Sequence, residues 1–330
     1  MLADYLVELF QVRELALNTI IGHKSAISAT WRLAGLPNLT LSPLITTLVE
    51  GFRVRRPTVR ETFPPWDLSV VLNYLMGPPF EPLSKASLKF VTFKTVFLLA
   101  LASAARRSEL HALSMKDGHI VFSSNYTSVS LRPEVGFLAK NQVVDEIRLP
   151  LVIPGLQHRV QSDMPDRTLC PVRALARYLE HTKFLRSGRV LPNGKPNERL
   201  FISIQQNRRS DISAPTISRW LHEVIVLALH GTLQSPALLA MSKITGHQVR
   251  GMAASLASFS GCATSQILDA VYWKNSSTFS SFYLKDLAQQ VGNVWSLGPV
   301  VAAASVCAGS NSSGVSVSSS RGKKSKAPRV

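Results

Sequence analysis

Six residues with side chains suited to phosphate chemistry occur in a fixed order along this chain: Arg106, Lys140, His247, Arg250, Trp273 and Tyr283. A guanidinium group keeps its charge and can hold two phosphate oxygens, so two arginines from different segments can grip one phosphate. Histidine and lysine can move protons, and tyrosine can attack phosphorus. The set predicts phosphoryl transfer without a metal ion.

Each residue has a predicted role in such a reaction. Arg106 and Arg250 hold the phosphate, and their charges stabilise the transition state. His247 lies one helical turn before Arg250 and accepts or relays the proton of the nucleophile. Tyr283 is the predicted nucleophile, and Lys140 is the acid that protonates the leaving 5′ oxygen.

Each of these residues also has an ordinary interpretation when it is taken alone. A single arginine is more often a surface or ion-pair residue, and a single tyrosine in a helix usually packs in a core. Trp273 either donates its indole N–H at the site or packs in the core, and both can hold. The prediction therefore depends on the whole ordered set.

No motif for a metal or a nucleotide cofactor occurs in the sequence. HExxH, Walker A, GxGxxG and an acidic cluster with two-metal spacing are all absent. Cys170, Cys262 and Cys307 are odd in number and far apart, which argues against a disulfide framework or a zinc site. We expect no cofactor, no metal and no small-molecule substrate.

The charge balance favours a polyanionic partner. The chain has 37 Lys and Arg residues against 20 Asp and Glu residues, a formal net charge of +17. Such a field attracts DNA, RNA or an anionic membrane surface. The apolar runs at 96–105 and 300–308 are too short to span a bilayer, and the N-terminus lacks a basic signal region. Nucleic acid is therefore the expected partner, and a membrane is not.

The predicted fold is mainly α with a small antiparallel β-sheet (α+β), in two domains. A helical unit covers residues 1–56, a basic linker residues 57–65, and a larger domain residues 66–290. An apolar segment at 291–308 follows, and the Ser-, Gly- and Lys-rich tail at 309–330 has a composition typical of disorder.

Basic and polar residues of the first unit and the linker are predicted to contact DNA: His23, Lys24, Arg32, Arg53, Arg55, Arg56 and Arg60. The first three lie on one face of a predicted helix whose buried face contains Ile20, Ile27 and Trp31. The arginines of the linker surround Pro57, which favours an extended connector. A solvated helix face is an equally good interpretation of the first group.

The larger domain is predicted to contain helices near 67–76, 84–104, 106–114, 171–185, 214–229, 246–259, 263–270 and 275–290. Between residues 118 and 152 the pattern changes to alternating and branched residues, which predicts three antiparallel strands. Lys140 falls on the connection that leads into the last strand.

The ordered residues and their contexts resemble those of the tyrosine recombinases, the phage-integrase-like superfamily. ARRSEL (105–110) resembles the R-x-S-E-L motif of that family, which assigns the catalytic arginine to Arg106. GHQVR (246–250) resembles its H-x-x-R motif, and Trp273 occupies a position often held by His or Trp. Trp273 precedes Tyr283 by ten residues, one more than is usual in the bacterial and phage members.

Four further segments resemble the recombinases of DIRS-like retrotransposons: LNTIIGHKSAIS (17–28), LCPVRALARYLE (169–180), APTISRWL (214–221) and SSTFSSFYLKD (276–286). The resemblance covers roughly residues 1–290. It implies a SAM-like core-binding domain that joins the catalytic domain in clamping duplex DNA. The abrupt start at the first helix leaves open whether the core-binding domain is complete or truncated.

The resemblance also implies a reaction and an assembly. Tyr283 forms a 3′-phosphotyrosine link and releases a 5′ hydroxyl, so DNA integration or recombination needs no ATP. Four protomers act together on the DNA, and the segment at 291–308 either docks on a neighbour or packs on its own domain. A mobile-element protein of this kind works in the nucleus of a eukaryote, or otherwise in the cytoplasm with the chromosome.

Other functions fit the same residues. The chain can be a catalytically silent DNA-binding relic of a mobile element, or a DNA-relaxing enzyme of the type IB topoisomerase kind. A helical scaffold without a nucleic-acid role fits least well. The DNA target, the host and the choice between integration, excision and inversion do not follow from these patterns.

Overall fold

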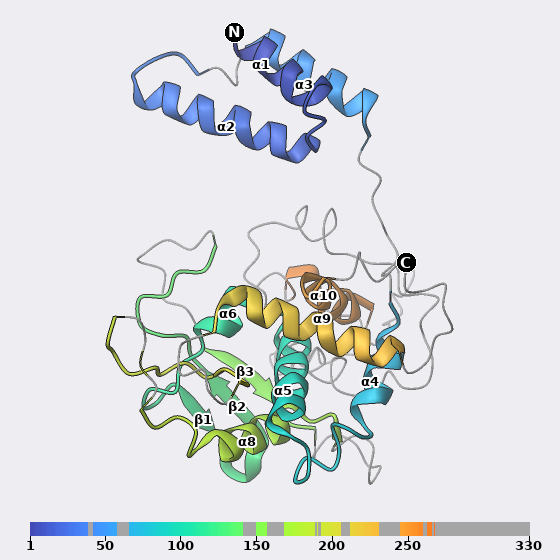
Figure 1. Ribbon diagram of the computed structural model, residues 1–330, viewed down its shortest axis with the longest axis vertical. Coiled ribbons are helices and arrows are strands. Elements are labelled where there is room, and N and C mark those ends of the chain that lie inside the picture. Colours follow the sequence, from blue (N-terminus) through green and yellow to red (C-terminus); the bar gives the residue numbers. More distant parts are fainter. Residues whose placement is uncertain are drawn as a thin grey trace, which may run out of the picture. The chain divides into compact units, whose positions relative to one another are not determined.

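The computed structural model describes residues 1–38, 42–57, 66–140, 150–156, 168–188, 190, 193–205, 212–230, 245–259, 263–265 and 267 (Figure 1). The chain divides into two compact units, Met1–Glu61 and Thr62–Val330. The division falls inside the segment 57–65. The described residues are mainly helical with one small antiparallel sheet, so the predicted α+β class is confirmed.

The first unit consists of three helices: α1 (Leu2–Gln11), α2 (Leu17–Leu33) and α3 (Pro43–Arg55). Their apolar faces meet in a small core in which Phe10 of α1 stacks on Phe52 of α3, with ring centroids 4.2 Å apart. Pro43 stands in the first turn of α3, where its missing N–H costs nothing.

Two expectations for this unit were wrong. Trp31 is 39% exposed instead of buried, because the core of the unit contacts α2 near Leu17 and Ile20 and does not reach its last turn. Helix α3 also continues to Arg55, so Arg53 and Arg55 belong to a helix and not to an extended connector. The helix ends there because Pro57 disfavours helical angles at the residue before it.

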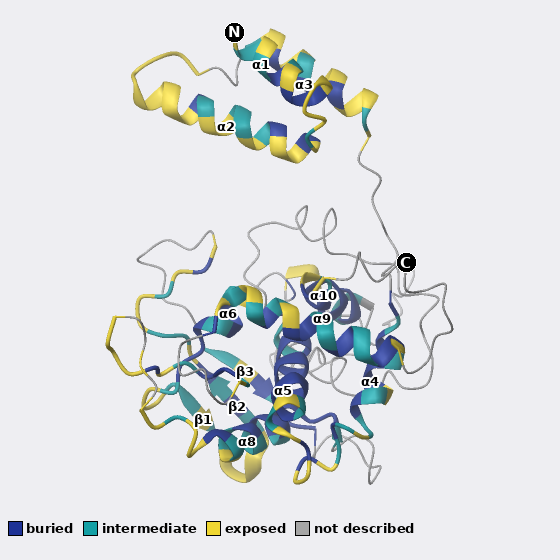
Figure 2. Cartoon of the chain, in the orientation of Figure 1, coloured by how far each residue is buried: buried dark blue, intermediate teal, exposed yellow. Residues whose placement is uncertain are grey.

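The described helices of the second unit are α4 (Leu68–Leu75), α5 (Leu88–Ser103), α6 (Arg107–Ala112), α8 (Pro171–Thr182), α9 (Ala214–His230) and α10 (His247–Phe259). Each matches a predicted helix. Helix α5 is at the centre and packs against α8, α9 and α10. Every residue from 91 to 101 is buried, and Figure 2 shows this helix in dark blue over most of its length. A helix buried on all sides has no solvated face, which explains the apolar run that starts at Val96. The polar residues before it, Thr92, Lys94 and Thr95, are buried as well and form hydrogen bonds.

The sheet has the strand order β1 (Ile120–Phe122), β2 (Ser128–Leu131) and β3 (Leu151–Pro154), and both pairs are antiparallel. Val129 on β2 is opposite Ile153 on β3, and both side chains are buried in the main core. The three-stranded sheet is therefore confirmed. Of the predicted helix at 263–270, residues 264, 265 and 267 are described and helical, and the one at 275–290 lies outside the described residues. No helix in the described ranges is long and apolar enough to cross a bilayer.

Candidate active site

A sharp corner between α5 and α6 positions Arg106. Ala104 ends α5 with φ 48° and ψ 27°, a left-handed conformation that turns the chain within three residues. Arg106 then precedes the first turn of α6. Its backbone N–H donates to Oε2 of Glu109 over 2.7 Å, and its Nη1 donates to Oε1 over 2.9 Å. One carboxylate thus holds both the backbone and the guanidinium of Arg106, as the acid of a capping box does for a helix start.

Arg250 reaches the same corner from α10. Its side chain is 2% exposed, and its Nη1 donates to the carbonyl oxygen of Ala104 over 2.6 Å. The same nitrogen lies 3.6 Å from Oε2 of Glu109, whose side chain is also buried. The two predicted phosphate-binding arginines therefore meet on one buried carboxylate. Such charged contacts fix both guanidinium groups more rigidly than solvent would.

Gly246 allows α10 to begin against α9. A Cβ atom at Gly246 would lie 2.7 Å from the backbone carbonyl oxygen of Ser218, a distance that real Cβ atoms do not tolerate. Gln248 secures the same turn, since its Oε1 accepts from the backbone N–H of Thr245 and from Nε1 of Trp66, each over 3.1 Å. His247 is thereby exposed at the first position of α10, one turn before Arg250.

Lys140 lies at the end of a segment that leaves β2 and packs on α6. The backbone N–H of Glu134 donates to the carbonyl oxygen of Ala112 over 2.7 Å, and the Glu134 carboxylate pairs with Arg199 over 2.8 Å. Ala139 is buried, and Lys140 itself is exposed. As predicted, Lys140 stands on the connection between the second and third strands.

Positive charges from other predicted site residues act on His247. Neighbouring protein atoms remove part of the hydration of the ring, and this lowers the pKa of His247 most, although solvent still reaches the residue. The positive charges of Arg250, Arg106, Arg107 and Lys140 lower this pKa further, in that order. The lowered pKa favours the neutral form of His247, which is the form that can accept a proton.

Four of the six predicted site residues are thus brought together: Arg106, Lys140, His247 and Arg250. Trp273 and Tyr283 lie outside the described residues, as do the segment at 291–308 and the tail. In the described part of the chain, no group of three or more His, Cys, Asp and Glu side chains is arranged to hold a metal ion.

Three residues of the site were missed by the sequence prediction. Glu109 had a usable signal, because an acid three residues after Arg106 at a helix start is the pattern of a capping box. Arg107 adjoins Arg106 and adds a fourth positive charge near His247. The role of Gly246 had no local signal, since it depends on the approach of α9.

The residues of α2 that were predicted to contact DNA differ in burial and in hydrogen bonding. Nδ1 of His23 lies 3.0 Å from the hydroxyl of Tyr5, so one ring nitrogen is already engaged. Lys24 is half-buried, and Arg32 is exposed at the end of α2. His23, Lys24 and Arg32 belong to one helix.

The arginines that follow differ in their exposure. Arg53 is exposed and pairs with Glu50, and Arg55 is exposed. Arg56 has a structural role: its Nη1 donates to the carbonyl oxygen of Leu15 over 3.1 Å, and its guanidinium lies 3.9 Å from the ring centroid of Phe10. Arg60 lies outside the described residues.

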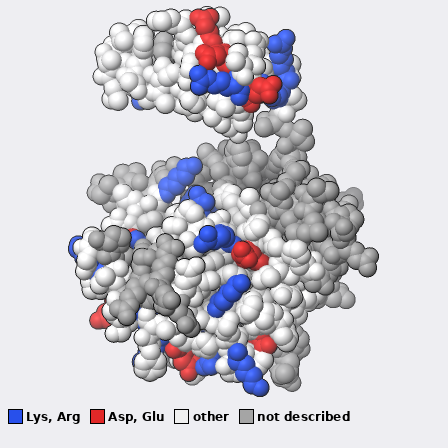
Figure 3. Space-filling model, in the orientation of Figure 1, with Lys and Arg blue, Asp and Glu red and all other residues white. Residues whose placement is uncertain are grey.

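Basic side chains are also visible on the second unit. On the face seen in Figure 3, Lys and Arg side chains extend from the upper edge to the middle, with an acidic side chain among them.

Comparison with known proteins returns recombinases and integrases at low similarity. No family model matches the chain, and no curated protein matches it. The XerA recombinase is 17% identical with a TM-score of 0.41, over 87% of this chain and 79% of that chain. A lambda integrase dimer bound to a COC′ core site is 15% identical with a TM-score of 0.45, over 88% of this chain and 65% of that one. A lambda integrase tetramer bound to a Holliday junction is 14% identical with a TM-score of 0.41, over 88% and 78%. Likeness at this level carries no conclusion about function.

Proposed function

We propose that this protein is a tyrosine recombinase, a metal-independent enzyme that cleaves and rejoins duplex DNA through a 3′-phosphotyrosine intermediate. One observation carries the proposal. Arg106 and Arg250 come from separate segments and meet on the buried carboxylate of Glu109. The charges of Arg250, Arg106 and Lys140 lower the pKa of His247, after the larger effect of burial. Arg106, Arg107, Arg250 and Lys140 surround His247, and Glu109 is the acid that contacts two of these arginines. This excess of positive charge suits an anionic substrate.

The chemistry follows from these positions. Arg106 and Arg250 donate to the non-bridging oxygens of the scissile phosphate, where negative charge increases in the transition state. Neutral His247 accepts the phenolic proton as the oxygen of Tyr283 attacks phosphorus. The bond from phosphorus to the 5′ oxygen breaks, and Lys140 gives its proton to that oxygen. A 5′ hydroxyl of a partner strand reverses these steps, so no ATP is consumed.

The assembly and origin belong to the same proposal. Duplex DNA is the partner, and four protomers act together, with the segment at 291–308 docked on a neighbour. The sequence contexts at 17–28 and 214–221 support an origin in a DIRS-like mobile element. Such an element integrates into a chromosome, which assigns the protein to the nucleus of a eukaryotic host.

A nicked suicide duplex that carries candidate element ends tests the chemistry. The wild-type protein should form an SDS-stable adduct in the presence of a metal chelator, and Tyr283→Phe should form none while DNA binding stays within about twofold. Tyr126→Phe, at an exposed tyrosine of the β1–β2 turn, is the matched control and should form the adduct normally. Adducts that persist in Tyr283→Phe would refute the assignment.

Two other outcomes identify the alternatives. Salt-dependent DNA binding without any adduct, on every candidate end, would favour a relic that only binds. Relaxation of supercoiled DNA by the monomer, without junction products, would favour an activity of the type IB topoisomerase kind.

A further inference from the structure

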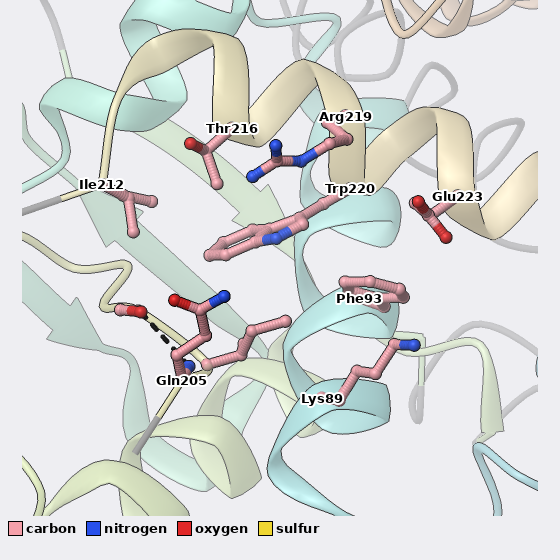
Figure 4. A pocket seen from close by; sticks show the side chains of 10 residues that line it. Lys89, Phe93, Gln205, Ile212, Thr216, Arg219, Trp220 and Glu223 are labelled. Carbon is pink, nitrogen blue, oxygen red and sulfur yellow. Dashed lines mark hydrogen bonds between the residues drawn. The ribbon is translucent and has the colours of Figure 1, made fainter. Parts of the chain in front are cut away.

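A pocket of about 270 Å³ lies between α5 and α9 (Figure 4). Its polar rim consists of Lys89 from α5, Gln205, and Thr216, Arg219 and Glu223 from α9. Thr216, Arg219 and Glu223 follow one another at helical spacing, and Figure 4 shows them on the same side of α9. The pocket therefore presents one face of this helix together with a lysine from its neighbour.

The floor of the pocket consists of buried aromatic rings. Phe93 and Trp220 line it, are 2% and 3% exposed, and have ring centroids 6.3 Å apart. Nζ of Lys89 lies 5.5 Å from the ring centroid of Phe93, which suits a cation–π contact. Buried aromatic rings hold their neighbours in place, so the charged rim has a fixed base.

Arg219 and Glu223 have no ion-pair partner among the residues that the structure describes. Arg219 is exposed and Glu223 is half-buried. They stand four residues apart on α9, where opposite charges often pair, and neither forms a salt bridge there. A donor fork and a carboxylate therefore both line the pocket.

Contacts of α9 bring this rim close to the site residues. The Cβ position of Gly246 is 2.7 Å from the carbonyl oxygen of Ser218. With about 3.8 Å between successive Cα atoms, the Cα atoms of Arg219 and His247 lie within about 14 Å of each other. Helix α6 also contacts the residues just before α9, since Nε2 of His111 lies 2.6 Å from the carbonyl oxygen of Ile212. One base pair rises about 3.4 Å, so for a duplex bound at the site this separation corresponds to at most about four base-pair steps.

We infer that Arg219 and Glu223 read a guanine and a cytosine in neighbouring base pairs of the target, through the major groove. An arginine donates two hydrogen bonds to O6 and N7 of guanine, and a carboxylate accepts from N4 of cytosine. Phosphate groups repel a carboxylate, so Glu223 fits a base edge and not the DNA backbone. Lys89, a point charge on the opposite side of the pocket, suits a phosphate.

Helix geometry limits the spacing of the two bases. Residues four apart on a helix rise about 6 Å, which is between one and two base-pair steps. The two bases are therefore expected in adjacent or next-adjacent base pairs. This inference rests on the proposed function, because it assumes that the duplex lies on the site.

Selection from a pool of random duplexes tests the inference. The wild-type protein should enrich a motif with a guanine and a cytosine one or two pairs apart. Arg219→Ala should lose the guanine preference, and Glu223→Gln should lose the cytosine preference, each by about tenfold or more in competition binding. Lys89→Ala is the control: it should keep the motif, weaken binding to all duplexes alike and lower the salt dependence by about one phosphate contact.

Adduct formation on the enriched duplex distinguishes base reading by Arg219 and Glu223 from the proposed recombinase function. An unchanged motif in Arg219→Ala and Glu223→Gln would overturn the inference, while adducts that depend on Tyr283 would leave the proposed function intact. A wild-type protein that binds every duplex equally would also overturn it. Absence of salt-dependent DNA binding would overturn both the base-reading inference and the proposed recombinase function.

Discussion

Nη1 of Arg250 lies 3.6 Å from Oε2 of Glu109, and both side chains are almost completely buried. Oε1 of the same carboxylate accepts from Arg106 over 2.9 Å. One acid therefore balances two arginines that come from α10 and from the α5–α6 corner. This links the stability of the domain to the geometry of its site, because a guanidinium that loses its buried partner is strongly destabilising.

Glu109→Ala should lower the free energy of unfolding by about 3–5 kcal/mol, since it leaves buried positive charge uncompensated. Urea denaturation measures the loss. Glu109→Gln keeps the shape and part of the hydrogen bonding, so it should lose less stability than the alanine variant. An unchanged urea midpoint in Glu109→Ala would show that the carboxylate does not support the two arginines.

Gly246→Ala should lower the free energy of unfolding by about 1–3 kcal/mol, because the new methyl group meets a backbone oxygen of α9 that cannot move aside. The start of α10 should shift, and adduct formation should fall with it. Gly77→Ala is a suitable control, as nothing lies within 4 Å of its Cβ position. Equal stability of the two variants would contradict this account.

The rate of adduct formation should fall as the pH falls through the pKa of His247, because only the neutral ring accepts a proton. The surroundings lower this pKa, so the midpoint should lie below the ordinary value of about 6.5. Arg107→Ala removes a positive charge that favours the neutral ring, and should therefore move the midpoint to higher pH. An NMR titration of the His247 ring measures its pKa directly, without an activity assay. A lower pKa in Arg107→Ala than in the wild type would contradict the expected effect of the Arg107 charge.

Lys94 should make stability depend on pH above neutrality. Its Nζ is buried, 2.6 Å from Oε1 of Glu81 and 2.7 Å from the carbonyl oxygen of Leu75, and burial lowers the pKa of Lys94 to about 8. Between about pH 8 and 10 the unfolded chain binds more protons at this site than the folded one, so the free energy of unfolding rises with pH. Lys94→Met should remove this rise, as measured by urea midpoints. Lys89→Met, at an exposed lysine of the same helix, should keep it.

Most helices and strands could be predicted from the sequence because their signals are local. The helix predicted near 67–76 is α4, whose start is fixed by the Asp67 carboxylate accepting from the backbone N–H of Ser69 over 2.8 Å. Alternation of apolar residues at 128–131 predicted β2 in the same way. The prediction failed at Trp31, where helical spacing continues past the end of the core that α2 contacts.

The sequence by itself determined which residues can do chemistry and the order in which they occur. Arg106, Lys140, His247 and Arg250 were predicted as site residues in this way, because residue type and motif context are properties of the chain. Only the tertiary structure decided that the charges of Arg106, Arg250 and Lys140 reach His247 and that Glu109 is buried between the two arginines.

Tertiary structure likewise decided the lowered pKa of His247 and the use of Arg56 to hold the first unit together. The reason is physical. Helix and strand signals depend on neighbours a few residues away, whereas burial and charge interactions depend on distances through space between distant segments. In the second unit, the packing of α6, α9 and α10 around α5 sets those distances.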